Sequence, residues 1–261
     1  MSTSRVQYET DGPLGFVTVN RPEARNAMTW DMYEALVAAC ERADTDDGLR
    51  ALIVRSTGDK AFISGTDISQ FTDFSTPDAP IKYERHLDAV IDRLERVRVP
   101  TIAQIQGVAA GGGCAIAMAC DLRVCAPEAT FGVPIARTLG NCLSAANYAR
   151  LVDLIGPART KDILFTGRLI DAAEAESLGL VTRMAARADL DAVTRALAES
   201  IAANAPLTLR ATKEAVRRIQ EHRRIERELA DDLILLCYTS HDFQEGVSAF
   251  LAKRPPQFRG R

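Results

Sequence analysis

Three consecutive glycines, Gly111 to Gly113, open an apolar, alanine-rich stretch that ends at Asp121. Because glycine carries no side chain, a ligand can approach the main chain closely at such a point. The stretch that follows predicts a buried helix, whose first N–H groups and dipole favour negative charge. The feature therefore predicts a sharp turn into a helix, with a candidate site for an anionic group at that turn.

The residues around this turn alternate between two periodicities. Short apolar and β-branched runs predict strands at residues 16–20, 51–56, 101–106 and 122–125. Longer stretches with helical spacing predict helices at residues 29–42 and 81–96, with Thr29 as a cap and Pro100 as a stop signal. This βαβ rhythm predicts an α/β core.

The pattern becomes nearly continuously helical after Gly156, from residue 158 to residue 252, with interruptions at Gly167, Gly179 and Pro206. We therefore expect a core over residues 1–200 and a C-terminal helical region over residues 201–261. The segment 72–80 is rich in Thr, Asp, Ser and Pro, which predicts an exposed, mobile loop.

The overall composition argues against several classes of function. A net charge of −3 over 261 residues does not supply the basic face that nucleic acid requires. The first residues lack a signal-peptide pattern, and no window approaches a membrane span, so we expect a cytoplasmic protein without a membrane partner. The six cysteines form no CxxC pair, which favours reduced, buried thiols over a metal or disulfide site.

A second turn lies in residues 60–68, where a brief apolar strand is predicted to meet small residues and then a helix start. Gly65 allows the backbone to turn tightly, so that the amide of Thr66 can face outward. Each of the two turns taken alone could be an ordinary tight turn at the end of a strand. Together they suggest two backbone N–H groups that converge on one ligand.

Both turns and their flanks resemble the crotonase (enoyl-CoA hydratase/isomerase) superfamily. The resemblance rests on RPEARNAM at residues 21–28, SGTD at 64–67 and GVAAGGGCAIAMACDLRV at 107–124. It continues through FGVP at 131–134 and DFQEG at 242–246, and so covers nearly the whole chain. The resemblance implies an α/β fold, a spiral of ββα units with a C-terminal helical trimerisation region. It also implies a homotrimer or a dimer of trimers.

The resemblance implies an acyl-CoA substrate whose thioester enolate is held by two backbone N–H groups, which fall on Thr66 and Gly112. Coenzyme A arrives as part of the substrate, with no permanently bound cofactor and no metal. The residues expected to bind it are Arg25, Ala27, Ser64, Asp67, Ile68 and Lys253, with help from Phe250. From the residues alone, Arg25 and Lys253 could equally be solvated surface charges, and Asp67 is better interpreted as a helix cap than as a base.

Hydratases of this superfamily use two glutamates for general acid-base chemistry, and this chain has neither. The corresponding positions are Ala115 and Ile135, and no carboxylate occurs in residues 137–144. Plain enoyl-CoA hydration is therefore disfavoured, while isomerase, decarboxylase or hydrolase chemistry through an enolate stays open. The alternative from another class is a non-catalytic acyl-CoA-binding oligomer.

Other groups remain as candidates for proton transfer or substrate recognition. They are Asp73, Asp78, Glu84, His86, Asp88, Cys114, Arg137, Cys142, Ser144 and Tyr148. His86 has a reference pKa near neutrality, and Arg137 could recognise a carboxylate. The alternatives without a function in the site are that His86 is merely exposed, that Arg137 forms a structural ion pair and that Cys142 is a packed thiol. A serine hydrolase and a dinucleotide-binding protein are disfavoured, because the chain has neither a GxSxG nor a GxGxxG motif in the required context.

Overall fold

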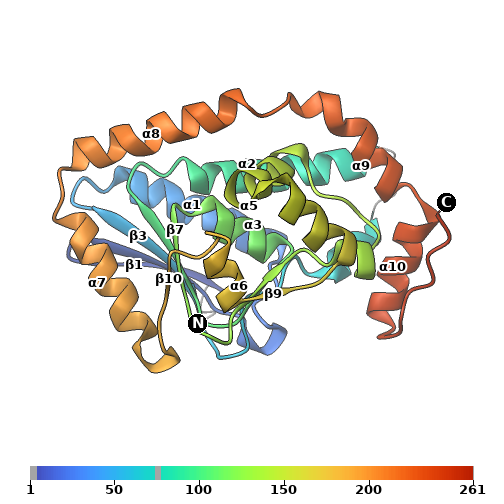
Figure 1. Ribbon diagram of the computed structural model, residues 1–261, viewed down its shortest axis with the longest axis horizontal. Helices are drawn as coiled ribbons and strands as arrows, with labels where there is room; N and C mark the ends of the chain where they lie inside the picture. Colours follow the sequence, from blue (N-terminus) through green and yellow to red (C-terminus); the bar gives the residue numbers. More distant parts are fainter. Residues whose placement is uncertain (1–4, 74–77, 261) are drawn as a thin grey trace.

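The strands form two sheets that share a core (Figure 1). The computed structural model describes residues 5–73 and 78–260, side chains excepted at 72, 73 and 227. A six-stranded sheet has the order β1-β2-β3-β5-β7-β10. Its strands are β1 (Val6–Asp11), β2 (Leu14–Val19), β3 (Ala51–Ser56), β5 (Thr101–Ile105), β7 (Leu122–Cys125) and β10 (Arg183–Met184). β1 and β2 pair antiparallel, and all other pairs in this sheet are parallel.

A second, four-stranded sheet has the order β4-β6-β8-β9. Its strands are β4 (Ala61–Ile63), β6 (Val108–Ala110), β8 (Thr130–Gly132) and β9 (Ile170–Asp171). The chain repeatedly places one strand in each sheet and then forms a helix. The helices after these strand pairs are α2 (Ala79–Glu95), α3 (Gly112–Ala119) and α4 (Ile135–Thr138). The predicted repetition of ββα units is therefore confirmed.

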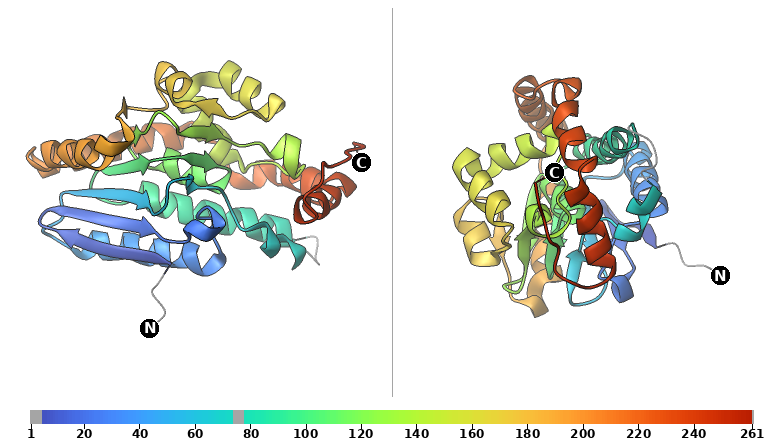
Figure 2. Two further views of the ribbon diagram at one scale, coloured as in Figure 1. Left: turned by 90° about the horizontal axis from the view of Figure 1, so that it is seen from below. Right: turned by 90° about the vertical axis from the view of Figure 1, so that its right-hand side faces the viewer.

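Two apolar cores lie on opposite faces of the six-stranded sheet, because successive side chains of a strand point to opposite sides. In β2, Phe16 packs toward α7 (Leu190–Ala202), while Val17 packs toward the core of α1 (Trp30–Thr45), α2 and α3. Both views of Figure 2 show the strands layered between α1 and α2 on one side and α5 (Ala145–Thr166) and α6 (Ala172–Ser177) on the other.

The remaining helices extend away from this core toward the C-terminus. They are α8 (Pro206–His222), α9 (Asp231–Tyr238) and α10 (His241–Leu251), and 3-10 turns occur at η1 (Pro22–Ala24), η2 (Ile68–Asp73), η3 (Arg187–Asp189) and η4 (Arg227–Ala230). α8 lies along one edge of the molecule, α9 packs on α2, and α10 packs on η2 (Figure 1). The predicted division after residue 200 falls within α7, and it stays a prediction. Within the described residues, no helix is both long and apolar enough to span a bilayer.

Several details differ from the sequence-based predictions. The expected helical stretch from residue 158 contains the short strands β9 and β10, and its first helix already begins at Ala145 and kinks at Gly156. Thr29 occupies the N-cap position without a capping side-chain bond, and Gln70 accepts a hydrogen bond from the Trp30 amide, at 3.1 Å. Residues 74–77 of the predicted mobile loop lie outside the described residues, whereas 68–73 form η2 and α2 begins at Ala79.

Candidate active site

A cavity of about 590 Å³ lies where the two predicted turns meet α2, α4 and α10. Its lining is predominantly apolar, with a few polar groups that converge on it, which is typical of a site for a small molecule. It includes every site residue expected from the sequence except Lys253: Arg25, Ala27, Ser64, Thr66, Asp67, Ile68 and Gly112. The structure therefore brings these seven residues to one place.

The first turn fixes the direction of the Thr66 amide. Gly65 has φ 116°, a conformation that favours glycine, and its carbonyl accepts a hydrogen bond from the Met28 amide at 2.8 Å. The Asp67 amide donates to the Met28 carbonyl, also at 2.8 Å. The neighbours of Thr66 are thus paired with Met28, and within the described residues the Thr66 N–H donates no hydrogen bond.

The second turn presents the amide of Gly112. Gly111 has φ 52°, and its amide donates to the carbonyl of Gly132 at 3.0 Å, which anchors the turn to β8. Gly112 is the first residue of α3, so its N–H has no acceptor within the helix. A Cβ atom on Gly112 would lie 3.7 Å from the Thr66 nitrogen. The two turns therefore lie against each other, with two N–H groups that have no acceptor in the described part of the chain.

Two tyrosine hydroxyls lie against the same turn, and sequence analysis did not identify them. The hydroxyl of Tyr33 lies 2.9 Å from Thr66 Oγ1, and that of Tyr83 lies 3.2 Å from the same atom. Burial raises the pKa of both tyrosines, so both stay neutral. These hydroxyls hold the side chain of Thr66, which lines the cavity.

Asp67 is a structural carboxylate, as its position at a helix start suggested. It accepts a hydrogen bond from the Ser69 amide at 3.1 Å and forms an ion pair with Arg21 at 2.7 Å. Burial alone would raise the pKa of Asp67, but the hydrogen bonds from Ser69 and Arg21 outweigh it and lower that pKa. A carboxylate that is ionised and bound to both Ser69 and Arg21 suits the interpretation of Asp67 as a cap rather than a base.

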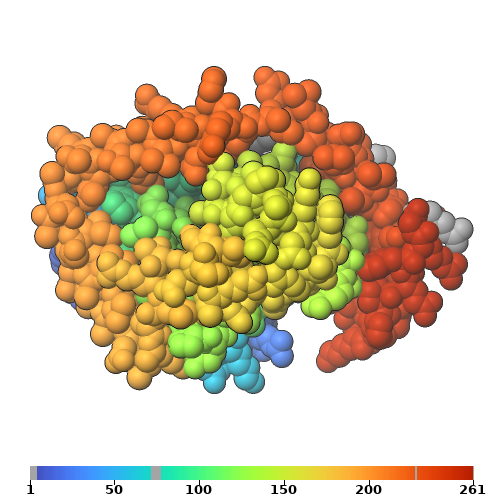
Figure 3. Space-filling view, in the orientation of Figure 1, coloured from blue at the N-terminus to red at the C-terminus, as the bar shows by residue number. Residues whose placement is uncertain are grey.

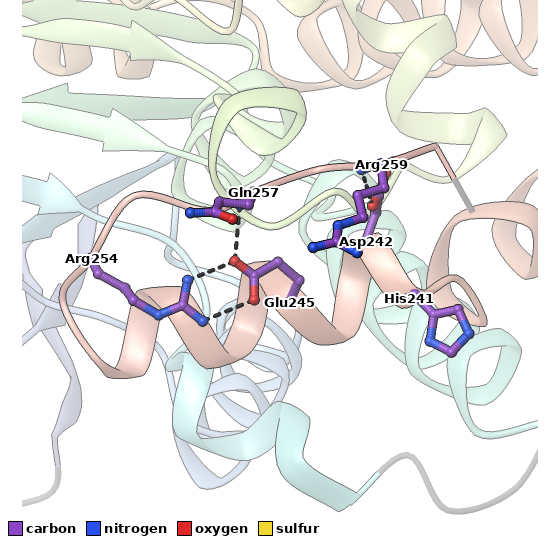
Figure 4. A pocket seen from close by; sticks show the side chains of 6 residues that line it. All are labelled: His241, Asp242, Glu245, Arg254, Gln257 and Arg259. Atoms are coloured by element: carbon purple, nitrogen blue, oxygen red, sulfur yellow. Dashed lines mark hydrogen bonds and ion pairs between the residues drawn. The ribbon is translucent and has the colours of Figure 1, made fainter.

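Lys253 does not line the first cavity and lies two residues beyond the end of α10. Its neighbour Arg254 lines a second cavity of about 550 Å³, whose lining residues are all polar or charged (Figure 4). There Arg254 pairs with Glu245 at 2.6 Å, and Asp242 accepts a hydrogen bond from the Arg259 amide at 2.6 Å. Phe250 does line the first cavity, whereas the role of Lys253 toward coenzyme A stays a prediction.

Most of the candidate acid-base groups do not reach the first cavity. His86 packs edge-on against Trp30 and lies 3.1 Å from a carboxylate oxygen of Glu34, and Asp78 and Arg137 are exposed outside it. Neither His86 nor Arg137 therefore lines this cavity. The Asp73 side chain lies outside the described residues. Ile135 lines the cavity, and Ala115 is buried in α3.

Three further candidates have structural roles. The Ser144 hydroxyl accepts the Asn147 amide at the start of α5 and donates to Asp88 at 2.6 Å. Cys114 is buried, and burial raises its pKa to about 11. Tyr148 does not line the cavity, and burial raises its pKa to about 12.

Glu84 and Cys142 are the two acid-base candidates that line the cavity. The Cys142 thiol is buried and donates to the Leu233 carbonyl at 3.4 Å, as expected of a packed thiol. Glu84 is 3% exposed and accepts a hydrogen bond from the hydroxyl of Tyr238. Burial raises the pKa of Glu84 to about 8.

The spacing of residues in α2 contains a signal that Glu84 is buried. Glu84, Leu87, Asp88 and Ile91 follow the i, i+3, i+4, i+7 spacing of one helix face, and Leu87 and Ile91 are core residues. A carboxylate in phase with core residues predicts a buried acid. Within the described residues, no group of three or more His, Cys, Asp or Glu side chains could hold a metal ion.

Comparison with known proteins places this geometry in a family context. The family model described as Enoyl-CoA hydratase/isomerase matches residues 9–261. The chain is 37% identical over 262 residues to the probable enoyl-CoA hydratase echA8 of Mycobacterium tuberculosis, with all of both chains covered. It is 32% identical to the short-chain-enoyl-CoA hydratase of Clostridium acetobutylicum, with 97% of each chain covered.

Solved structures give the same result for the fold. A methylmalonyl-CoA decarboxylase in complex with 2-nitronate-propionyl-CoA superposes with a TM-score of 0.91 at 26% identity, over all of both chains. An enoyl-CoA hydratase/carnithine racemase from Magnetospirillum magneticum superposes with a TM-score of 0.81 at 33% identity, over 100% of this chain and 97% of that one.

Proposed function

The chain belongs to the enoyl-CoA hydratase/isomerase family of the crotonase superfamily, and we propose that it is an enzyme that stabilises the enolate of an acyl-CoA thioester. The observation that carries the proposal is that Thr66 and Gly112 line one cavity and that their N–H groups have no acceptor in the described part of the chain. The thioester carbonyl oxygen would accept both hydrogen bonds.

These two donors favour the enolate over the neutral thioester. Negative charge develops on the carbonyl oxygen as the enolate forms, and fixed donors then strengthen their bonds to it. In a site shielded from water, each such donor contributes on the order of 3 to 4 kcal/mol to the stability of the transition state. The dipole of α3, whose first residue is Gly112, acts in the same direction.

The groups that bind coenzyme A are proposed to lie at the mouth of the same cavity. Arg25 has a left-handed backbone, φ 51°, and its carbonyl accepts the Ser64 amide at 3.2 Å, which ties the two binding segments together. Ala27, Ser64, Asp67 and Ile68 line the wall beside it. Coenzyme A would enter and leave with the substrate, so the proposal needs no permanently bound cofactor.

The chemistry that follows enolate formation is proposed to differ from hydration. Ala115 and Ile135 cannot transfer a proton or position a water molecule, although the Mycobacterium and Clostridium relatives are named hydratases. An enolate can also form by loss of a proton or of carbon dioxide, which needs the two amides but not those glutamates. The close superposition on a methylmalonyl-CoA decarboxylase supports this range, which includes isomerase, decarboxylase and hydrolase chemistry.

The function is tested by incubating the protein in heavy water with saturated, unsaturated, β-keto and malonyl-type acyl-CoAs. We expect at least one thioester to gain deuterium at its α-carbon, to lose carbon dioxide or to release coenzyme A, as followed by mass spectrometry. Binding of these thioesters with no change in any of them would contradict the proposal. It would favour the alternative, a non-catalytic acyl-CoA-binding oligomer.

We further propose that the C-terminal helices assemble the chain into a trimer or a dimer of trimers. The support is a row of exposed apolar side chains over α8, η4 and α9: Leu207, Val216, Ile219, Ile225, Leu229, Leu233 and Leu236. α8 buries none of its residues in this chain, and Figure 3 shows the surface hollowed beneath it. Apolar surface of this kind marks a protein–protein interface.

Substitution of Leu236 by Glu tests this assembly. Leu236 is 72% exposed in the single chain, so a charge there is harmless to a monomer but would be buried in an oligomer. We expect Leu236→Glu to shift the protein toward monomers in size-exclusion chromatography with light scattering. The matched control is Met184→Glu, an exposed apolar residue of β10, which should elute as the unaltered protein does. Elution of the unaltered protein as a monomer would contradict the proposal.

A further inference from the structure

A buried acid of this cavity, Glu84, lies on α2, away from both positions that hydratases use. Glu84 and Thr66 line the same cavity. The Tyr83 hydroxyl, one residue before Glu84, lies 3.2 Å from Thr66 Oγ1. Glu84 also lies close enough to Tyr33 to raise its pKa, and the Tyr33 hydroxyl lies 2.6 Å from where a Cβ of Gly112 would stand. Glu84, Thr66 and Gly112 therefore line one cavity, and Tyr83, the neighbour of Glu84, contacts the Thr66 side chain.

We infer that Glu84, oriented by Tyr238, is the residue that exchanges a proton with the acyl-CoA enolate. The inference rests on the proposed function, because it assigns the proton-transfer group of that same site. The Tyr238 hydroxyl donates to Glu84 Oε1 and itself accepts a hydrogen bond from Asn141 Nδ2 at 3.0 Å. These two hydrogen bonds link α2, α9 and the loop before α5, and so hold the carboxyl group of Glu84 in one orientation.

The surroundings of Glu84 keep a proton available near neutral pH. The titratable groups that face it come from α1, α2, α5, α9 and the loop before α5: Tyr33, Tyr83, Asp88, Cys142, Tyr148 and Tyr238. Within the described residues, Glu84 forms no ion pair with a cation. Burial without a compensating positive charge raises its pKa to about 8, so both protonation states are accessible near neutrality.

The step is a proton transfer between carbon and oxygen. The Glu84 carboxylate takes a proton from the α-carbon, the C–H bond breaks, and an O–H bond forms on Glu84. The electron pair moves to the thioester oxygen, which the amides of Thr66 and Gly112 hold. The reverse step returns a proton to the α-carbon, and in heavy water it returns deuterium. One negative charge moves from the Glu84 carboxylate to the enolate, so an ionised Glu84 and the enolate it forms are never present together.

Exchange of the α-proton in heavy water, measured against pH on a thioester that the unaltered protein turns over, tests this role. We expect the unaltered protein to exchange faster as pH rises, with a midpoint at about 8, because the carboxylate is the active base. Glu84→Gln should lower the maximal rate by about 10²-fold or more with little change in KM. Glu84→Asp should recover part of that rate.

Two further variants, the control Asp88→Asn and the positioning variant Tyr238→Phe, test whether the pH midpoint belongs to Glu84. Asp88→Asn removes a buried carboxyl group one turn along α2 that does not line the cavity, so it should retain turnover and lower the midpoint slightly, since Asp88 raises the pKa of Glu84. Tyr238→Phe should raise the midpoint, because the hydrogen bond from Tyr238 lowers the pKa of Glu84. A purely structural role for either residue would not move the midpoint in these directions.

The outcomes separate this inference from the function on which it rests. Exchange by Glu84→Gln within a few-fold of the unaltered protein, with the same pH midpoint, would overturn the role of Glu84 and leave the enolate chemistry intact. Should Glu84→Gln fail to fold, an unchanged midpoint in Tyr238→Phe would overturn it instead. Loss of carbon dioxide or release of coenzyme A without any exchange in the unaltered protein would also overturn the role of Glu84. No change in any of the thioesters would overturn the proposed function itself.

Discussion

Gly112→Pro is expected to lower turnover by on the order of 10²- to 10³-fold, because proline removes one of the two N–H donors. Gly112 is the first residue of α3, a position where proline suits the helix geometry. The proline ring would also occupy the space into which the N–H now points. The measurement is the steady-state rate on the thioester identified in heavy water, together with the affinity for that thioester.

The control must separate loss of the N–H from the added bulk. A Cβ on Gly112 would lie 2.6 Å from the Tyr33 hydroxyl, so any substitution there also meets that side chain. Both variants are therefore made in a Tyr33→Phe background, which removes the hydroxyl. Gly112→Ala in this background keeps the N–H and should retain most of the turnover, while Gly112→Pro should lose it. Equal rates in the two variants would contradict the role of the Gly112 amide.

Gly113→Ala is expected to destabilise the fold by more than about 4 kcal/mol, a loss that few single substitutions cause. A Cβ on Gly113 would lie 1.9 Å from the carbonyl oxygen of Ile63 and 2.7 Å from its carbonyl carbon. These are backbone atoms of β4, which pairs with β6, so they cannot move aside as a flexible side chain could. We expect a large drop in the urea midpoint or a failure to obtain soluble protein.

Gly48→Ala is the matched control for this prediction. Gly48 is exposed, and its nearest neighbour is the flexible Asp46 side chain, 3.3 Å from the added Cβ. The control should unfold within about 1 kcal/mol of the unaltered protein. A Gly113→Ala variant as stable as the Gly48→Ala variant would show that α3 does not pack against β4 as closely as described.

Most strands of four or more residues could be predicted from the sequence, but β1 was missed. Strands β2, β3 and β5 have five or six residues each, enough for their apolar pattern to be recognised. β4 could be recognised only as a brief apolar strand, whereas β6 and β8, of three residues each, lie beside glycines, where periodicity carries no signal. Their place in a second sheet depends on pairing between distant segments, which local patterns do not encode.

The site divides in the same way. The two turns could be predicted, because glycines 65 and 111–113 mark turns whose geometry depends on local sequence. The side chains around them come from elements far apart in the chain: Tyr33 from α1, Glu84 from α2 and Tyr238 from α9. The residue type alone drew attention to His86, because histidine side chains in general titrate near neutral pH. Only the packed structure shows that Glu84 is buried and that this burial raises its pKa to about 8.

The central claim is that the amides of Thr66 and Gly112 polarise the bound thioester carbonyl. Isotope-edited infrared difference spectroscopy tests it directly, with an acyl-CoA that carries ¹³C at that carbonyl, bound to the Tyr33→Phe background with Gly112→Ala or Gly112→Pro. We predict a carbonyl band shifted to lower frequency in the alanine variant, and a much smaller shift in the proline variant. A bound carbonyl at its solution frequency in the alanine variant, or the same shift in both variants, would contradict the account.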